Sequence, residues 1–137
     1  MRVTELAQIE VLDVLFRPGA RRDEISLRVA ITKGGRQRCI YLIHVKAIEA
    51  LNRHLNIRMA RRLRTTSELG RYRALEKASK LILTHSGGKF HLNTKRRVIW
   101  AGEPVDYLAC ESLQSHITKL YRDAAYGAAR HTAAAVR

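Results

Sequence analysis

The alternation of apolar and polar positions in the first third of the chain predicts β-structure. Apolar side chains occupy every second position from residue 25 to residue 31, which is the period of a half-buried strand. Residues 39–45 are apolar on both faces, as in a central strand, and the Gly-Gly pair at 34–35 is typical of a tight hairpin turn. Residues 8–16 fit a strand or a helix, and we take them as a strand. Residues 1–45 are thus predicted to form a three-stranded antiparallel meander.

Helical periodicity replaces this alternation after residue 45. Ile48, Leu51 and Leu55 are spaced three and four residues apart, so they share one face of a helix. In one interpretation this helix ends at a break over residues 56–57. In the other, the apolar stripe continues and a single helix runs over residues 46–64. Periodicity alone leaves both interpretations open.

Residues 57–92 hold the most informative pattern in the chain. A short helix over 57–63 leads into a turn, where Thr65 and Glu68 have the spacing of a capping box. The next helix is predicted over residues 66–79, with one apolar face. Its opposite face carries small and cationic residues, which suit a close approach to phosphates and base edges.

A glycine-rich hairpin is predicted after this helix. Residues 81–83 and 89–92 have the composition of short strands, and the His-Ser-Gly-Gly sequence at 85–88 is typical of a turn. Residues 93–97 are predicted to form a basic turn and residues 98–100 a further strand.

The C-terminal part is predicted to be a long helix over residues 105–126. Pro104 suits its first turn, and its apolar stripe fits packing on the domain or pairing with a second copy. The predicted fold class is therefore α+β: a three-stranded antiparallel meander, a winged-helix-like helix-turn-helix with a β-hairpin, and a long C-terminal helix. The predicted regions are 1–45 (meander, as scaffold, dimer contact or second nucleic-acid surface), 46–103 (winged-helix-like nucleic-acid-binding region), 104–127 (C-terminal helix) and 128–137 (flexible tail).

Two stretches of sequence carry a family resemblance. The sequence ARRLRTTSELGRYRAL at 60–75 resembles the helix, turn and recognition helix of a winged helix-turn-helix domain, and LEKASKLI at 75–82 with the glycine-rich hairpin resembles the junction to the wing. The resemblance is confined to residues 57–92 and is at the level of the superfamily. It implies binding to duplex DNA, with the second helix in the major groove.

The charge of the chain agrees with this expectation. The sequence holds 26 Lys and Arg residues against 12 Asp and Glu residues, a net charge of +14. Residues 46–100 carry 14 of the cations and three of the acids, so most of the excess is concentrated there. A concentrated excess attracts a polyanion, and such binding weakens with salt.

The candidate binding residues follow from these elements. We expect arginines beside the turn to hold phosphates, residues of the 66–79 helix to face the major groove, and cations of the hairpin region to reach the flanking backbone. The predicted nucleic-acid-binding residues are Arg61, Arg62, Arg64, Thr66, Ser67, Arg71, Arg73, Lys77, Lys89, Lys95, Arg96 and Arg97.

Aromatic residues separate duplex from single-stranded targets. The chain has five Tyr, two Phe and one Trp. The patterns predict that Tyr72, Phe90 and Trp100 point inward. Because few rings are then left to stack on unpaired bases, the duplex backbone is the favoured target.

Catalytic and metal-binding patterns are scarce. The basic region lacks the clustered carboxylates of a metal-dependent nuclease. His85 and His91 flank the predicted hairpin and fit either a metal or phosphate ligand or plain polar residues, and we expect no metal site. Cys39 and Cys110 have no redox or metal spacing and are predicted to be buried thiols of a reducing cytoplasm. No signal peptide or transmembrane run is predicted.

These patterns lead to one functional hypothesis and two alternatives. We expect a cytoplasmic, non-enzymatic DNA-binding protein of a prokaryote, phage or mobile element, without a cofactor. It would act in transcription or replication regulation, or as the DNA-binding subunit of a larger assembly, and a homodimer would favour specific binding. The alternatives are a structural RNA-binding subunit of a ribonucleoprotein and an adaptor for an acidic protein partner.

Overall fold

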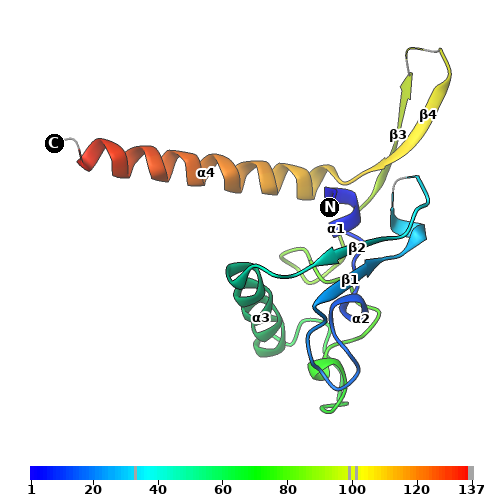
Figure 1. The fold of residues 1–137 in the computed structure, drawn as a ribbon, viewed down its shortest axis with the longest axis vertical. Coiled ribbons are helices and arrows are strands. Elements are labelled where there is room, and N and C mark those ends of the chain that lie inside the picture. The colour runs from blue at the N-terminus through cyan, green and yellow to red at the C-terminus, as the bar shows by residue number, and fades with distance from the viewer. Residues whose placement is uncertain (33, 99, 101, 136–137) are drawn as a thin grey trace. The chain divides into compact units, whose positions relative to one another are not determined.

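The computed structural model of the protein describes residues 1–32, 34–98, 100 and 102–135, with side chains described as far as residue 125. The described residues form a mixed α and β structure with four α-helices and two two-stranded antiparallel sheets (Figure 1). The chain divides into two compact units, Met1–Lys89 and Phe90–Arg137. This division falls between the predicted boundaries at residues 45 and 103.

The first unit begins with two short helices, α1 (Val3–Leu6) and α2 (Val11–Val14). In both helices the acidic side chain at the third position caps the N-terminus. Glu5 accepts a hydrogen bond from the N–H of Arg2 at 2.8 Å, and Asp13 accepts one from the N–H of Glu10 at 2.9 Å. The predicted strand over 8–16 is therefore wrong, because these carboxylates cap helical turns in that region.

The predicted meander is reduced to one pair of strands. Strands β1 (Glu24–Leu27) and β2 (Arg38–Tyr41) pair antiparallel, with Ile25 opposite Ile40. β1 ends early because a 3₁₀ turn occupies Val29–Ile31. The expectation of a central strand over 39–45 is also wrong, because β2 has one neighbour and its side chains are largely exposed.

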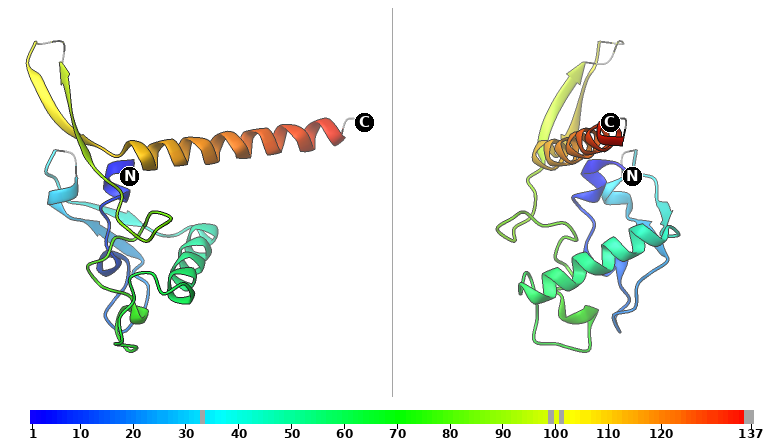
Figure 2. Two further views of the ribbon diagram at one scale, coloured as in Figure 1. Left: turned by 180° about the vertical axis from the view of Figure 1, so that it is seen from behind. Right: turned by 90° about the vertical axis from the view of Figure 1, so that its left-hand side faces the viewer.

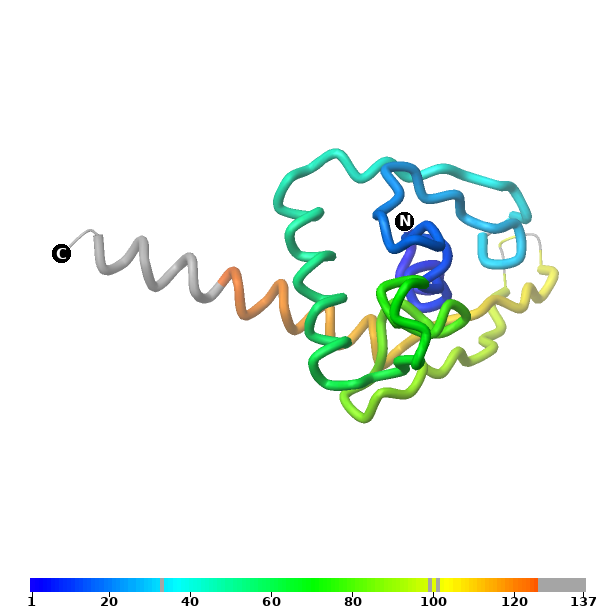
Figure 3. Tube along the Cα trace, turned by 90° about the horizontal axis from the view of Figure 1, so that it is seen from below, coloured from blue at the N-terminus to red at the C-terminus, as the bar shows by residue number. Residues whose placement is uncertain are grey.

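Helix α3 (Val45–Ala60) is a single helix and appears as an unbroken coil in Figure 3. Its N-cap is His44, whose Nδ1 accepts a hydrogen bond from the N–H of Lys46 at 3.2 Å. Asn56 and Ile57 lie within the helix, which ends at residue 60. The structure therefore supports the unbroken interpretation as far as Ala60 and not to residue 64.

Residues 66–79, all of them described, contain no α-helix. Their one helical element is a 3₁₀ turn at Tyr72–Ala74, in which all three residues have positive φ angles. The N–H of Glu76 donates to the carbonyl of Arg64 at 2.9 Å, and Thr65 forms a β-bridge with Leu75. Residues 64–76 therefore form a closed loop, and the predicted recognition helix is wrong.

The loop is stabilised by the core rather than by helical periodicity. Leu75 is buried, whereas Leu69, which shared its predicted helix face, is 80% exposed. Segment 79–81 continues from the loop and pairs with residues 9–11, with the Leu81 N–H donating to the Ile9 carbonyl at 2.7 Å. The core of buried apolar side chains consists of Ile9, Val11, Val14, Leu15, Ile25, Leu27, Leu55, Leu75 and Leu81.

The glycine-rich turn predicted at 85–88 is present. The N–H of Thr84 donates to the carbonyl of Gly88 at 2.8 Å, and the Gly88 N–H donates to the Thr84 hydroxyl at 3.1 Å. The strands predicted on either side are reduced to one β-bridge between Leu83 and Lys89. With no recognition helix and no extended wing in these described residues, the expected winged-helix arrangement does not form.

The second unit consists of a hairpin and a helix (Figure 2). Strands β3 (Asn93–Val98) and β4 (Pro104–Ala109) pair antiparallel, and α4 spans Glu111–Ala135. The predicted basic turn at 93–97 is therefore a strand.

The start and the end of the C-terminal helix also differ from the prediction. Pro104 begins a strand, so the helix starts at Glu111 and not at residue 105. α4 continues through most of the predicted tail at 128–137, of which residues 136–137 lie outside the description. Of the predicted strand at 98–100, Val98 ends β3 and residue 99 lies outside the described residues.

Candidate functional site

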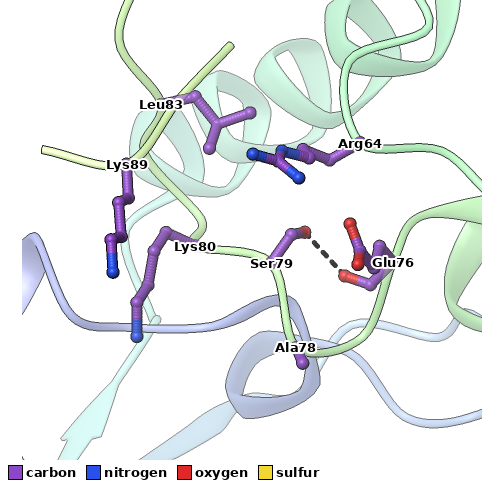
Figure 4. Close-up of a pocket in the computed structure, with 7 residues that line it drawn as sticks. All are labelled: Arg64, Glu76, Ala78, Ser79, Lys80, Leu83 and Lys89. Carbon is purple, nitrogen blue, oxygen red and sulfur yellow. Dashed lines mark hydrogen bonds between the residues drawn. The ribbon is translucent and has the colours of Figure 1, made fainter.

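Segments that follow α3 in the chain line a recess of about 350 Å³ that is open to solvent (Figure 4). We call it the cationic recess, because three of its lining side chains are basic and one is acidic. The lining residues are Arg64, Glu76, Ala78, Ser79, Lys80, Leu83 and Lys89. All of them belong to the first unit.

The chain reverses direction sharply where α3 ends, and this reversal brings Arg64 to the recess. The N–H of Leu63 donates to the Arg58 carbonyl at 3.0 Å, which closes the helix end. Arg62 and Arg64 both have a φ of 53°, a left-handed conformation that is strained for residues with a Cβ. Such strain persists where the surrounding contacts determine the conformation.

The glycine turn provides one of those contacts. Nε of Arg64 donates to the Gly87 carbonyl at 3.3 Å. A Cβ on Gly87 would lie 3.2 Å from a methyl carbon of Leu63. Gly87 also has a φ of +84°, so glycine is required at this position for both its conformation and its close packing.

Arg58 lies behind the recess and connects its two sides. It is 1% exposed. Its Nη1 donates to the Lys80 carbonyl at 3.0 Å, and its Nη2 donates to the hydroxyl of Ser79 at 2.9 Å and to the Leu63 carbonyl at 3.4 Å. The guanidinium therefore holds the segment after α3 against residues 79–81.

Burial lowers the pKa of the Arg58 guanidinium from its ordinary value. The nearby carboxylate of Glu76 opposes this effect, and the positive charge of Arg64 adds to it. An arginine stays charged at neutral pH even with such a shift, so Arg58 adds a positive charge behind the recess.

Ser79 and Glu76 form the polar wall. The Ser79 hydroxyl donates to the main-chain carbonyl of Glu76 at 2.6 Å, shown as the dashed line in Figure 4. Because this hydroxyl also accepts from Arg58, its orientation is determined by two partners. The Glu76 carboxylate is the one acidic group among the lining residues.

The three basic side chains of the recess differ in their partners. Lys80 Nζ donates to Glu10 at 3.0 Å, so its charge is largely balanced. Among the described residues, Arg64 and Lys89 have no carboxylate within ion-pair distance. Arg64 reaches across the recess toward Leu83 in Figure 4. The unbalanced positive charge therefore comes from Arg64 and Lys89.

Five other predicted binding residues are exposed in this unit, and the three cations among them have no ion pair in the described part of the chain. Arg61 and Arg62 directly follow α3, next to Arg64. Thr66 and Ser67 lie at the start of the 64–76 loop, where the Thr66 hydroxyl accepts a hydrogen bond from the Glu68 N–H at 3.3 Å. Lys77 is likewise exposed and has no acidic partner among the described residues.

Two predicted reading residues have structural contacts instead. Arg71 forms an ion pair with Glu68 at 3.2 Å. Arg73 is half-buried, with its Nε donating to the Gly19 carbonyl at 2.7 Å and its Nη1 to the Asn52 side chain at 3.1 Å. The predicted base-reading role of Arg73 is therefore wrong, because its guanidinium holds the 64–76 loop in place.

The remaining predicted cations lie on β3 in the second unit. Lys95 is paired with Glu111, and Arg96 with Asp106 at 2.9 Å. The guanidinium carbon of Arg97 lies 6.0 Å from the centre of the Tyr107 ring. Two of these three charges are thus neutralised by acids of their own unit.

Sequence reasoning missed Arg58, Glu76, Ser79 and Lys80 as parts of the site. Arg58 gave one signal, because it lies three residues after Leu55 and so on the inward face of α3. The others gave none, since long-range pairing with residues 9–11 brings them into position.

Two expectations about side-chain burial need correction. Trp100 was expected to point inward but is fully exposed, while Tyr72 and Phe90 are half-buried. Cys39 was expected to be buried and is exposed, whereas Cys110 is buried as expected.

In the part of the chain that the structure describes, no group of three or more His, Cys, Asp or Glu side chains is placed to hold a metal ion. No described helix combines the length and the apolar character needed to cross a membrane. Comparison of the chain with protein-family models, with curated proteins and with solved structures gave no match.

Proposed function

We propose that this protein binds nucleic acid through backbone phosphates, with duplex DNA as its preferred target, and that it acts as a DNA-binding regulator or as the DNA-binding subunit of a larger assembly. The observation that carries the proposal is the group of exposed arginines after α3. Arg61, Arg62 and Arg64 lie within four residues and have no acidic partner among the described residues. We call these three residues the arginine cluster.

The overall charge of the first unit supports a polyanionic ligand. Residues 1–89 contain 19 Lys and Arg residues and eight acidic ones. Several of these cations are paired within the unit, for example Arg28 with Asp13 and Arg38 with Glu5. The arginine cluster and Lys89 are among the cations of this unit without an acidic partner in the described residues. They lie on adjacent segments, since Arg64 donates to the Gly87 carbonyl, and this position concentrates the charge.

The chemistry of these side chains favours phosphate over base contacts. A guanidinium donates two parallel hydrogen bonds to a phosphate. No aromatic ring is among the described residues that line the cationic recess, so base stacking has no support at this site. Reading of the major groove by residues 66–79 is not part of the proposal, because those residues form a loop. We therefore expect modest sequence preference.

The test is a fluorescence anisotropy titration with duplex DNA, a structured RNA and single strands of equal length. We expect the duplex to bind most tightly. With four phosphate contacts, the slope of log affinity against log salt is about −3 to −4. Lys46→Gln, at the other end of α3, is the matched control for Arg62→Gln, since each removes one positive charge. Equal affinity of the two variants for the duplex contradicts the proposal.

Structured RNA is the second candidate, and one observation favours it. Trp100 is fully exposed, and Tyr41 and Tyr121 are 62% and 76% exposed. Exposed rings offer stacking surfaces for unpaired bases. A preference for the structured RNA over the duplex in the same titration, together with weaker RNA binding by Trp100→Ala, favours this candidate.

A further inference from the structure

We propose that the cationic recess is a pocket for a single phosphate group. The inference rests on the proposed function for the source of the phosphate, a nucleic acid, but its chemistry is testable with inorganic phosphate alone. It assigns Arg64 and Lys89 as the binding groups and Glu76 as the residue that limits the affinity.

The recess has the size for such a ligand. The recess has a volume of about 350 Å³, well above the roughly 10–15 Å³ of such space that one water molecule needs, so it holds an oxyanion with several waters around it. Its wall of Ser79, Glu76 and Lys80 is polar. A hydrated anion therefore fits this space better than an apolar ligand does.

Arg64 is oriented for binding before a ligand arrives. Its Nε is used by the Gly87 carbonyl, which fixes the guanidinium plane. Among the described residues, its two Nη groups have no hydrogen-bond partner. Two free, parallel donors on a fixed plane match two oxygens of a phosphate, and fixing them in advance lowers the entropy cost of binding.

Hydrogen bonds also fix the backbone of Arg64 at the edge of the recess. Its positive φ angle is strained, yet the Glu76 N–H donates to its carbonyl and thereby closes the 64–76 loop. Arg58 fixes the opposite wall through the Ser79 hydroxyl and the Lys80 carbonyl. The two walls are therefore connected through one buried side chain.

The charges of the recess favour one oxyanion. Lys80 is balanced by Glu10. Arg64 and Lys89, with Arg58 behind them, outnumber the single carboxylate of Glu76. An anion that enters is attracted by the excess and repelled by Glu76, so removing this carboxylate strengthens binding. A purely structural role of these residues does not predict such a gain.

The experiment is isothermal titration calorimetry of the full chain with inorganic phosphate at low salt. We expect Arg64→Gln and Lys89→Gln each to weaken binding by about tenfold, the loss typical of one charge-assisted hydrogen bond. Glu76→Gln is expected to tighten binding several-fold, and Lys46→Gln to leave it unchanged. Thermal melts of every variant establish that each one is folded.

Three outcomes overturn the inference: absence of phosphate binding, unchanged or weaker binding by a folded Glu76→Gln variant, or equal losses in Lys46→Gln and Lys89→Gln. Loss of phosphate binding with intact duplex binding overturns the pocket and leaves the proposed function standing. Phosphate binding without duplex binding overturns the proposed function and leaves the phosphate pocket standing.

A further arm distinguishes the two sources of phosphate. Duplexes with a 5′-phosphate and with a 5′-hydroxyl are compared in the wild-type protein and in Lys89→Gln. A preference for the phosphorylated end that is lost in Lys89→Gln assigns the pocket to strand ends. Equal binding of both duplexes, with competition by inorganic phosphate, assigns it to the phosphodiester backbone.

Discussion

Two basic segments of this protein have similar composition and opposite surroundings. The arginine cluster after α3 has three cations without an acidic partner among the described residues, whereas β3 presents Lys95 and Arg96 to Glu111 and Asp106. The sequence of residues 81–100 contains no acid at all, so a count along the chain predicts free charge there. The antiparallel pairing of β3 with β4 places Asp106 opposite Arg96. Available charge therefore depends on which acids the fold brings within reach.

The largest expected effect comes from removing the side chain that holds the arginine cluster in place. Arg58→Met leaves the carbonyls of Leu63 and Lys80 and the Ser79 hydroxyl without their donor in a buried site. We expect a loss of roughly 2–4 kcal/mol in the free energy of unfolding, measured by urea denaturation. Arg53→Met, on the same helix but exposed, is the control and should change stability by less than about 0.5 kcal/mol. Similar values for the two variants are incompatible with the role assigned to Arg58.

A smaller effect is expected at the glycine turn that positions Arg64. Gly87→Ala forces a Cβ into a positive φ angle and to within 3.2 Å of Leu63. We expect a cost of about 1–2 kcal/mol and weaker phosphate binding. Gly70→Ala is the matched control, because nothing lies within 4 Å of the added Cβ. If both variants melt at the same temperature, the turn does not constrain the recess.

The smallest effect concerns the paired cations of the hairpin. The hydrogen bond from Lys95 lowers the pKa of the Glu111 carboxyl, and the same bond raises the pKa of Lys95. A carboxyl group whose pKa is lowered in the folded protein stabilises the fold at pH values above its ordinary pKa. This contribution is lost as the pH falls through the lowered pKa. For Lys95 the contribution is lost as the pH rises through the raised pKa.

We expect Lys95→Met to return the Glu111 titration, followed by NMR of its carboxyl carbon, toward the ordinary value. Arg96→Gln is the control, because Arg96 pairs with Asp106. An unchanged Glu111 midpoint in Lys95→Met means that the pair does not form in solution.

Local patterns predicted some elements of the fold well. The apolar stripe of Ile48, Leu51 and Leu55 predicted α3, and the His-Ser-Gly-Gly sequence at 85–88 predicted the turn that contains Gly87. The α+β class was also correct. In these elements the hydrogen bonds lie within a few residues of one another, so the pattern along the chain contains the information.

The wrong predictions around the recess concern segments whose partners are distant. Leu69 and Leu75 have helical spacing, but Leu75 is buried through a bridge to Thr65 and residues 79–81 pair with residues 9–11. Tertiary pairing here overrides local preference. The same reason explains why Arg64 and Lys89 were predicted as binding residues while Glu76, Ser79 and Lys80 beside them were not.

The central claim is that unpaired arginines after α3, and not the paired cations of β3, contact the nucleic-acid backbone. The most direct measurement is the salt dependence of duplex affinity for Arg62→Gln and Arg96→Gln. We predict that Arg62→Gln reduces the magnitude of the slope of log affinity against log salt by about 1, while Arg96→Gln leaves it unchanged. A reduced slope in Arg96→Gln with an unchanged slope in Arg62→Gln contradicts the account.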